Sequence, residues 1–303
     1  MSRSLTATHV PCCACIDIGS NTTRLLVAQA NGTRLQELLS ERAFTHLGVA
    51  TADGCAVGPQ KIDEVAAVVA RQVRLAEELG AASLRVVATA AVGQAVDRTA
   101  LAAAIEAACG ARLEILAPVD EARLAFGGAI GMLLEPPAGL IGVVDVGGGS
   151  TELVVGTAEG GVSWSVSLPV GSAVVTHHDL PSDPPPPVEL ARAREKLRRL
   201  FAPVRAPQPE VAYAVGGSAT SLQRLVGVSL GREALMRGLQ ALVTRPAAEV
   251  AIRLGLAPER ARLLPAGILL LDAASHALRA PLQLAGGGLR EGVVFEQLAA
   301  LDL

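Results

Sequence analysis

The alternation of apolar and polar residues predicts a β-hairpin near the start of the chain. Residues 14–18 (ACIDI) and 23–30 (TRLLVAQA) have the pattern of strands, and the polar turn 19–22 (GSNT) lies between them. Two such runs joined by a short turn that contains glycine are typical of a hairpin. From 59 to 79 the apolar residues instead recur every three or four positions, which predicts a helix that ends at Gly80.

Strands and helices alternate through the rest of the first half. A buried strand is expected at 84–89 and a shorter one at 113–116. Helical patterns at about 97–108 and 120–134 lie on either side of the shorter strand. This alternation is typical of an α/β layer.

The second half begins with a similar pattern. An apolar strand at 140–144 enters a glycine-rich turn, and the chain leaves that turn through a second strand at 153–156. A further strand is expected near 162–168. The segment therefore predicts another set of short paired strands.

The last third of the chain is predicted to be mostly helical. Residues 188–303 have helical patterns, interrupted by short strands at about 211–215 and 281–284. Before them, the proline-rich run 181–187 (PSDPPPP) cannot form a regular element. We expect it to be a stiff surface loop inside the second domain.

Two stretches of the chain align without a gap. IDIGSNTTRLLVA, which contains Asp17, aligns with VDVGGGSTELVVG, which contains Asp145, at an offset of 128 residues. Each stretch has the order strand, aspartate, glycine-containing turn, strand, so the repeat predicts two hairpins that face a common cleft. The backbone amides of such turns can cradle phosphate oxygens, and the two aspartates can hold a hydrated Mg²⁺ between them. The alternative is two unrelated tight turns in which glycine supplies a positive φ.

The composition excludes several classes of protein. The chain has 303 residues with 26 basic and 29 acidic side chains, and its net charge of −3 excludes a polycationic nucleic-acid binder. The length suggests two domains, and a hydrophobic fraction of 50% is enough for a core in each. Because aromatic residues make up only 2%, small aliphatic side chains must form these cores, which suits thin α/β layers.

We expect a cytoplasmic protein that does not span a membrane. The best apolar run, 263–271, contains Pro265 and is closed by Arg262 and Asp272, so it falls short of the ~20 residues of a membrane span. The N-terminus lacks the apolar core of a signal peptide. The five cysteines do not have the even spacing of a secreted disulfide scaffold.

Two local patterns resemble metal ligands but favour simpler roles. Cys12 and Cys15 have the spacing of half a zinc site or a redox pair, yet no second pair completes it, and they run directly into a strand pattern. His177 and His178 are adjacent and therefore cannot share one face of a helix. We expect these histidines to be exposed at the end of a helix.

Taken together, the motifs resemble those of the exopolyphosphatase and guanosine pentaphosphatase (Ppx/GppA) family, in the actin/hexokinase/Hsp70 superfamily. The resemblance covers nearly the whole chain. The motifs that carry it are DIGSNTTRLLVA (17–28), ATAAVGQA (88–95), DEARLAFGG (120–128), DVGGGSTELVVG (145–156), LPVGS (168–172), AVGGSATSL (214–222), LLPAGILLLDA (263–273) and LAGGGLREGVVFE (284–296). Several of them are weak alone, but their order and spacing are specific.

The resemblance implies an α/β fold of two ribonuclease-H-like (actin-like ATPase) domains, with the active site in the cleft between them. We place the first domain at 1–130 and the second at 131–303. The C-terminal helix, at about 289–301, is a candidate to pack back on the first domain. The short length is similar to that of family members without additional C-terminal helical domains.

The activity that the resemblance implies is Mg²⁺-dependent hydrolysis of terminal phosphoanhydride bonds. The substrate would be inorganic polyphosphate, shortened one phosphate at a time, or pppGpp, which would lose its 5′ terminal phosphate. The alternative is a catalytically weakened protein that binds or senses polyphosphate or (p)ppGpp. A sugar or acetate kinase of the same superfamily is disfavoured, because Glu121 and the glycine-rich turns match the phosphatase branch. No nucleic-acid or membrane partner is expected, and a homodimer is one option.

The resemblance also assigns roles to single residues. Glu121 matches the catalytic glutamate, which orients and deprotonates the attacking water; its simpler role would be an acidic residue in the first turn of a helix. Asp17, Asp145 and Glu152 match metal-associated carboxylates. The residues matched to phosphate binding are Ser20, Asn21, Gly147, Gly148, Gly149, Ser150, Gly216, Gly217 and Ser218. Further candidates for phosphate binding are Arg24, which could instead lie on the surface of its strand, Arg98 and Arg290.

One position departs from the family pattern. Relatives usually have an arginine where this chain has Gly93, within the segment 88–95. We expect the strand-to-helix form of that segment to present position 93 toward the cleft. An arginine binds phosphate with two parallel hydrogen bonds, so its loss would slow turnover. This departure is the basis of the binding-protein alternative.

Overall fold

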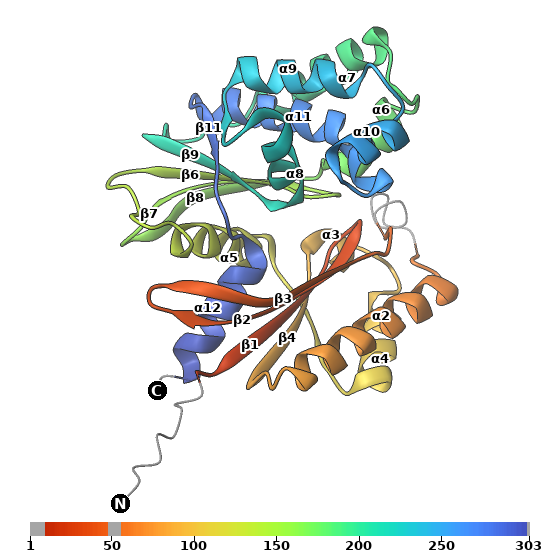
Figure 1. Ribbon diagram of the computed structural model, residues 1–303, viewed down its shortest axis with the longest axis vertical. Helices are drawn as coiled ribbons and strands as arrows, with labels where there is room; N and C mark the ends of the chain where they lie inside the picture. Colours follow the sequence, from red (N-terminus) through yellow and green to blue (C-terminus); the bar gives the residue numbers. More distant parts are fainter. Residues whose placement is uncertain (1–9, 48–55, 302–303) are drawn as a thin grey trace, which may run out of the picture.

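Two β-sheets with helices form the molecule that Figure 1 shows, a computed structural model that describes residues 10–47 and 56–301. The first half contains β1 (Cys12–Ile18), β2 (Thr22–Asn31), β3 (Arg34–Phe44), α2 (Pro59–Glu78), β4 (Ser83–Ala88), α3 (Ala90–Gly93), α4 (Arg98–Cys109), β5 (Leu113–Ile115) and α5 (Pro118–Gly131). The second half contains β6 (Ile141–Val146), β7 (Thr151–Thr157), β8 (Gly161–Leu168), α6 (Ser172–Asp179), α7 (Pro187–Phe201), β9 (Val211–Val215), α8 (Gly216–Val226), β10 (Ser229–Leu230), α9 (Arg232–Leu242), α10 (Ala247–Leu254), α11 (Pro258–Leu278), β11 (Leu282–Leu284) and α12 (Leu289–Leu301).

The repeat that the sequence predicts is a structural repeat. β1 and β2 pair antiparallel with Asp17 opposite Arg24, and β6 and β7 pair antiparallel with Asp145 opposite Glu152. Both turns close with the same bond: in the first the N–H of Gly19 donates to the carbonyl of Thr22 at 3.0 Å. In the second, Gly147 donates to Ser150, also at 3.0 Å. The two hairpins therefore have equivalent strand pairing and the same turn hydrogen bond.

The repeat extends to whole sheets. The first sheet has the strand order β3-β2-β1-β4-β5, and the second has β8-β7-β6-β9-β11-β10. In both, the first three strands along the chain form an antiparallel meander, and the next strands pair parallel to its first strand and to each other. β10, which pairs antiparallel with β11, is an addition to the second sheet.

Most predicted elements are confirmed, and the exceptions have a visible cause. Strand β3 was not predicted, because most of its side chains are exposed or half-buried and its sequence RLQELLSERAF carries little apolar signal. The proline-rich run is a loop, as expected, and α7 begins at its last proline, Pro187. Within this loop, the carboxylate of Asp183 accepts from the N–H of Ala247 at 2.9 Å, which satisfies a donor at the start of α10.

Helices cover the outer faces of the sheets. α2 and α4 pack on the first sheet through residues such as Val65 and Leu101. α7, α8, α9 and α11 pack on the second sheet in the largest apolar cluster of the molecule. α11 is long and apolar enough to cross a membrane, but 72% of its most apolar window is buried inside the protein. Its apolar composition is therefore explained by its place in the core.

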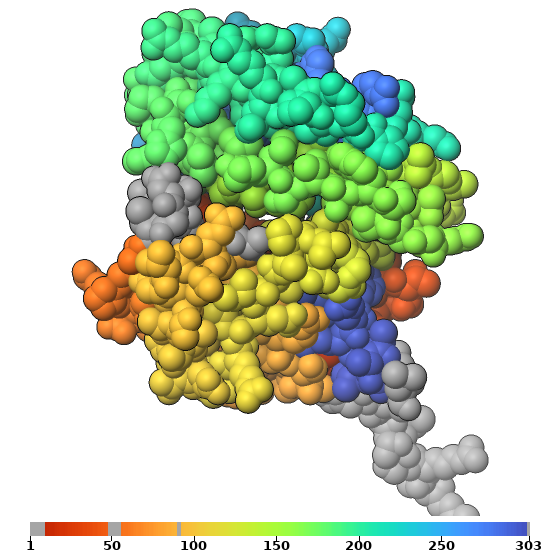
Figure 2. Space-filling view, turned by 180° about the vertical axis from the view of Figure 1, so that it is seen from behind, coloured from red at the N-terminus to blue at the C-terminus, as the bar shows by residue number. Residues whose placement is uncertain are grey.

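The inner faces of the two sheets are covered by exchanged helices. α5 follows the first sheet along the chain, yet Ala122 and Phe126 pack on the second sheet. α12 follows the second sheet, yet Leu289 and Val293 pack on the first, beside β1. Figure 1 shows both helices between the sheets, and from behind, Figure 2 shows the blue C-terminal helix among the yellow and orange residues of the first half. The domain boundary at residue 130 stays a prediction.

Glycines allow α5 and α12 to cross in backbone contact. A Cβ atom on Gly128 would lie 1.9 Å from the carbonyl oxygen of Gly288, and one on Gly292 would lie 2.0 Å from that of Leu124. No larger residue fits at these two positions unless the helices separate. The glycines of two family motifs, DEARLAFGG and LAGGGLREG, therefore meet at this crossing.

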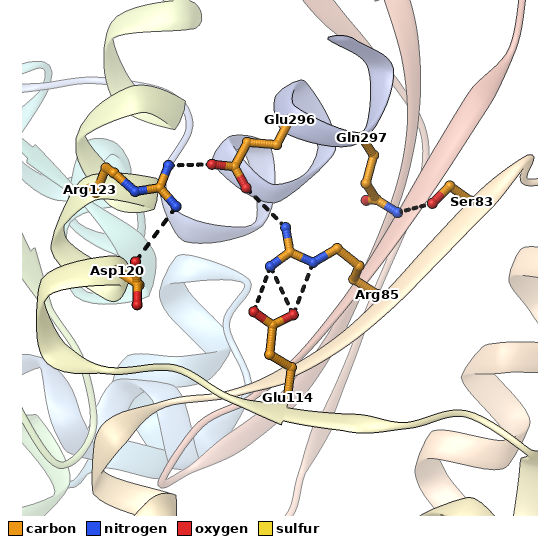
Figure 3. A network of polar contacts seen from close by, with 7 residues as sticks. All are labelled: Ser83, Arg85, Glu114, Asp120, Arg123, Glu296 and Gln297. Atoms are coloured by element: carbon orange, nitrogen blue, oxygen red, sulfur yellow. Dashed lines mark hydrogen bonds and ion pairs between the residues drawn. The ribbon is translucent and has the colours of Figure 1, made fainter. Parts of the chain in front are cut away.

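Polar contacts fasten α12 to both neighbours (Figure 3). Glu296 accepts from Arg123 of α5 and, at 3.0 Å, from Arg85 of β4. Arg85 also donates to both carboxylate oxygens of Glu114 in β5. At the next position of α12, Gln297 donates to the hydroxyl of Ser83 at 2.7 Å. Together these contacts connect α12 with α5 and with β4 at two positions, and through Arg85 with β5.

Candidate active site

The turns of the two hairpins meet at a small buried cavity between the sheets. Its volume is about 70 Å³. A Cβ atom on Gly148 would lie 3.0 Å from the Cβ of Asn21, so the turns touch across the cavity. The predicted site residues that line it are Asp17, Ser20, Asn21, Arg24, Glu121, Asp145, Gly147, Gly148, Gly149, Ser150, Glu152 and Gly217.

The second turn is held from behind, which leaves its amides available. The N–H groups of Ser172 and Ala173, at the start of α6, donate to the carbonyls of Gly147 and Gly148 at 2.9 and 3.0 Å. Within the described residues, the N–H groups of Gly148 and Gly149 have no acceptor. Unused amides of a tight glycine turn form a concave donor set for an anion.

Arg24 lies in the cavity rather than on the surface of its strand. Its Nη2 donates to Oδ2 of Asp17 at 2.8 Å, and its side chain is 19% exposed. Burial lowers the pKa of Arg24, but the ion pair with Asp17 outweighs that effect, so the net pKa is raised. Within the described part of the chain, Nε of Arg24 and Oδ1 of Asp17 are buried without a hydrogen bond. The pair therefore keeps one donor and one acceptor for a ligand.

A second guanidinium in the cavity was missed from the sequence. Arg260, in the first turn of α11, is only 6% exposed, and its Nη2 lies 2.8 Å from where a Cβ on Gly217 would be. Burial, together with repulsion from Arg42 and Arg24, lowers its pKa to about 10. Arg260 lies three residues before the apolar run 263–271 of α11, and a charged residue there is normally assigned to the surface. A cation at the start of a core helix is the signal that could have identified it.

The carboxylates opposite these cations are electrostatically strained. Burial raises the pKa of Asp145 to about 6, against the opposing effect of Arg24. The pKa of Glu152 is raised well above its usual value by burial and by the charges of Glu121 and Asp145. The hydroxyl of Ser167 partly offsets this shift by donating to Glu152 at 2.8 Å.

The donor set fits a hydrated divalent cation better than a fully coordinated one. In residues 10–47 and 56–301, no three His, Cys, Asp or Glu side chains are close enough to bind one ion together. Mg²⁺ usually binds through one or two carboxylates and retains several waters. Asp17 offers its unpartnered Oδ1. The raised pKa values of Asp145 and Glu152 reflect burial first and, after it, repulsion from neighbouring carboxylates, and a cation would relieve both effects. The residues present therefore fit Mg²⁺ held largely through water.

Glu121 is brought to the cavity by the exchanged helix. α5 begins with Pro118, and Glu121 in its first turn is 6% exposed and lines the cavity. Its charge contributes to the raised pKa of Glu152, so the two carboxylates are close. Because α5 packs on the second sheet, the carboxylate faces the second hairpin although its helix follows the first sheet along the chain.

Several predicted ligands lie outside the cavity. Arg98 is exposed on α4 and donates to the carbonyl of Ala95 at 3.4 Å. Arg290 turns toward the first sheet, where it donates to the carbonyl of Leu25 at 3.1 Å and to Ser40 at 3.3 Å. Neither residue lines the cavity between the hairpins.

Gly216 and Ser218 support the site from behind. Gly216 has a φ of +78°, and a Cβ there would lie 2.2 Å from Oδ1 of Asp145. Ser218 donates to the carbonyl of Val146 at 3.1 Å, which fixes α8 to β6. Of this loop only Gly217 lines the cavity.

The expectation that position 93 faces the cleft is wrong. A Cβ on Gly93 would point at the side chain of Ile115, 2.5 Å from its Cγ2, and Gly93 does not line the cavity. The φ of Gly93 is not positive. Of the same segment, Thr89 reaches the cavity instead.

The alternative metal patterns resolve into ordinary structure. Cys12 packs on one side of the first sheet and Cys15 on the other, because side chains three residues apart on a strand point in opposite directions. Burial raises the pKa of the Cys15 thiol, which keeps it protonated. His177 and His178 are exposed in the last turn of α6, as predicted.

Comparison with known proteins agrees with this architecture. Residues 26–301 match the Ppx/GppA phosphatase family. Exopolyphosphatase 1 of Mycobacterium leprae is 31% identical over 301 residues, covering 93% of this chain and 88% of that protein. Exopolyphosphatase 2 of Mycobacterium tuberculosis is 32% identical over 225 residues, 70% of each. The crystal structure of the Aquifex aeolicus member of the Ppx/GppA family superposes with a TM-score of 0.81 at 27% identity, covering 97% of this chain and 99% of that one. The predicted fold of two ribonuclease-H-like domains is thereby confirmed.

Proposed function

Because this chain belongs to the Ppx/GppA phosphatase family, we propose that it hydrolyses inorganic polyphosphate from the end, one phosphate at a time. One observation carries the proposal: a single cavity holds Glu121 beside two glycine turns and the guanidinium groups of Arg24 and Arg260. The relatives named exopolyphosphatase support the same substrate.

The terminal phosphate is bound by backbone amides and cations. The N–H groups of Gly148 and Gly149 donate to its oxygens, and Arg24 and Arg260 neutralise its charge. The side-chain amide of Asn21 adds a donor, since its Nδ2 is buried without a partner among the described residues. These groups hold the phosphorus atom in place while it is attacked.

Glu121 acts on water. Its carboxylate orients a water molecule and accepts a proton as the water oxygen bonds to the terminal phosphorus. The bond between that phosphorus and the bridging oxygen breaks, and the bridging oxygen leaves with its electron pair as the new end of the shortened chain. Because transfer of a phosphoryl group needs mainly positioning and charge neutralisation, one base and a cationic cradle are sufficient.

Mg²⁺ belongs to the proposal as a charge-neutralising ion. Asp17, Asp145 and Glu152 would hold it largely through water. When bound, it neutralises charge on the phosphate oxygens. Without it, the three carboxylates repel a polyanionic substrate, so we expect activity to require a divalent cation.

The presence of Gly93 at a position where relatives usually have an arginine no longer favours a protein that binds polyphosphate without hydrolysing it. Arg260 brings a guanidinium into the cavity from α11. The binding-protein alternative therefore has no observation in its favour. Hydrolysis of pppGpp and a cytoplasmic location stay predictions.

Phosphate release from several substrates tests the proposal. Purified protein is incubated with medium-chain polyphosphate, pppGpp or ATP, each with Mg²⁺ and with EDTA. We expect phosphate from polyphosphate in the presence of Mg²⁺ and little in EDTA. Tight binding of polyphosphate without release in any metal would contradict the proposal, and equal release in EDTA would remove the metal from it.

A further inference from the structure

A second and larger cavity lies in the second half of the molecule. Its volume is about 540 Å³, and α7, α9 and α11 form its walls. Small-molecule sites have volumes of roughly 300–1,000 Å³, so this cavity has the size of one. Figure 1 shows these helices on the side of the second sheet that faces away from the first half. In the described part of the chain, no residue lines both this cavity and the one between the hairpins.

The floor of this cavity is apolar. Leu197, Phe201 and Leu269 are buried side chains from α7 and α11, and Ala273 and Ala277 continue the surface along α11. Such a surface favours a ligand with a flat or apolar body.

The rim is strongly cationic although the whole chain is acidic. Five arginines line the cavity, namely Arg194, Arg198, Arg205, Arg232 and Arg279. Arg198 is paired with Glu195. Within residues 10–47 and 56–301, the other four form no ion pair: Arg194 donates to a methionine sulfur, Arg205 and Arg279 to carbonyls, and Arg232 to a histidine. Four unneutralised guanidinium groups around one cavity attract an anion.

A buried carboxylate lies beneath this rim. Asp272 lines the cavity, is 6% exposed, and its Oδ1 has no hydrogen-bond partner in the described residues. Nδ1 of the neighbouring His276 lies 3.7 Å from this oxygen, which is too far for a hydrogen bond, and donates instead to the backbone carbonyl of Asp272 at 2.8 Å. Its Nε2 accepts from Arg232 at 3.1 Å. A buried acceptor without a donor is costly unless a ligand satisfies it.

We propose that this cavity is a second ligand site, separate from the hydrolytic one, and that it binds a nucleotide. The base lies on the apolar floor and donates an N–H to Asp272, and the phosphate faces the arginines. A fatty acid would fill the floor but offers no donor to Asp272. Bare polyphosphate would use the arginines but leave both the floor and the carboxylate unsatisfied. A nucleotide is the common class of small molecule that matches all three features.

Binding of GMP and AMP tests the proposal without depending on hydrolysis. Each monophosphate is titrated into the full-length Glu121→Gln variant by calorimetry, in the presence of Mg²⁺ and saturating tripolyphosphate, which occupies the hydrolytic cavity without being consumed. Pyrophosphate is titrated alone as the anion without a base. The variants are Arg232→Gln and Arg279→Gln at the rim and Ala277→Trp at the floor. Arg253→Gln, an exposed arginine of α10 outside the cavity, is the matched control.

We expect at least one of the two nucleotides to bind with a Kd of about 1 mM or lower. Each rim variant should weaken binding by about tenfold or more, because hydrogen bonds to charged groups are lost. Ala277→Trp should abolish it, whereas Arg253→Gln should leave it unchanged. The melting temperature of each variant shows whether it folds. If Ala277→Trp does not fold, the two rim variants still test the site, because Arg232 and Arg279 are exposed.

Four outcomes would overturn the proposal. These are the absence of nucleotide binding, displacement of the nucleotide by tripolyphosphate, equal affinity in the rim variants, and binding of pyrophosphate as tight as that of the nucleotide. The last would leave an anion site without base recognition.

Discussion

At the scale of single residues, the cavity between the hairpins concentrates opposing charges. Asp17 and Arg24 neutralise each other at 2.8 Å, whereas Asp145 and Glu152 have raised pKa values and Arg260 a lowered one. Buried groups whose pKa values move toward neutrality are destabilised in their charged forms. The site therefore lowers the free energy of unfolding of the protein in the absence of ligand. Substitutions of single charged residues can test each contribution separately.

Glu121→Gln should abolish polyphosphate hydrolysis and leave polyphosphate affinity within a few fold. The amide keeps the size of the side chain but cannot accept the proton from water. Asp120→Asn is the control, because Asp120 belongs to the same helical turn but is half-exposed and does not line the cavity. Substantial turnover in Glu121→Gln would remove Glu121 from the mechanism.

Asp145→Asn should raise the melting temperature at pH 8 in EDTA while it lowers activity. The pKa of Asp145 is raised from 3.8 to about 6, so the folded protein binds the proton more tightly than the unfolded chain does. The resulting stabilisation is complete below about pH 4 and is lost as the pH rises through about 6. At pH 8 the ionised carboxylate is a net cost, which the asparagine removes. We expect the difference in melting temperature to be much smaller at pH 4.5, and a difference independent of pH would contradict this assignment.

Arg260→Met should raise the KM for polyphosphate by about tenfold or more, since a charged hydrogen bond to phosphate is lost. Methionine retains much of the apolar stem within the core. Arg253→Met, on the surface of α10, should leave KM unchanged. An unchanged KM in Arg260→Met would show that the guanidinium does not contact substrate.

At the scale of secondary-structure elements, the crossing of α5 and α12 positions Glu121, the carboxylate that we propose to be catalytic. The helices touch through Gly128 and Gly292, and Glu121 lies about two turns before Gly128. The contacts of Glu296 with Arg123 and Arg85 hold the same crossing on its polar side. Small changes at the crossing should therefore reach the site.

Gly128→Ala and Gly127→Ala should have opposite effects on stability. A Cβ at position 128 collides with the backbone of α12, which should cost roughly 1–3 kcal/mol or more. Nothing lies within 4 Å of a Cβ at 127, so alanine there should stabilise the helix by about 0.5–1 kcal/mol. Urea unfolding of both variants measures the difference. Equal stabilities would show that the helices can separate at no cost.

The hairpins and their turns could be predicted from the sequence because their signals are local. The spacing of Asp17 and Asp145, the glycine turns and the alternating apolar residues all lie within a dozen positions. β3 could not be predicted, since an exposed edge strand lacks an apolar face. Arg260 was not assigned either: a cation at the start of a core helix is a signal, but its role depends on the approach of α11 to the second hairpin, a contact distant in sequence.

The exchange of α5 was also beyond the local pattern, and the packing of α12 on the first half was expected only from the family resemblance. Their helical periods were visible, but each apolar face fits either sheet. The direction of Gly93 likewise depends on the packing of Ile115 against it, which the motif ATAAVGQA does not encode. The residues of the turns were therefore predictable from the sequence, whereas the sheet on which each helix packs and the direction of position 93 were not.

At the scale of the whole molecule, local charge opposes net charge. The chain carries a net charge of −3, yet Arg24 and Arg260 line the cavity. Arg42 and Arg290 lie close to this pair: besides the effect of burial, repulsion from Arg42 helps to lower the pKa of Arg260, and repulsion from Arg24 helps to lower the pKa values of Arg42 and Arg290. We expect attraction of a polyanion to the cavity between the hairpins to come from this cluster, because the net charge of the chain opposes it.

The KM for polyphosphate should therefore rise with salt, while kcat at saturation changes little. Salt screens the attraction between charges that are farther apart than about 10 Å at 0.1 M and about 3 Å at 1 M. Steady-state kinetics at 50 mM and 500 mM KCl measure both parameters. A flat KM would mean that the arginines act only within the closed cavity and do not attract the chain from solution.

The reciprocal covering of the two sheets bears on the ancestry of the fold. In each half, the helix that follows the last parallel strand leaves its own sheet and covers the other. Two identical copies of one such half would form a swapped homodimer with a twofold axis through the helix crossing. Joining the end of one copy to the start of the other would then give the present arrangement of sheets and crossing helices, to which the second half has added β10 and further helices. Gene fusion of that dimer would also have freed the two hairpins to diverge, one pairing its aspartate with Arg24 and the other with Glu152.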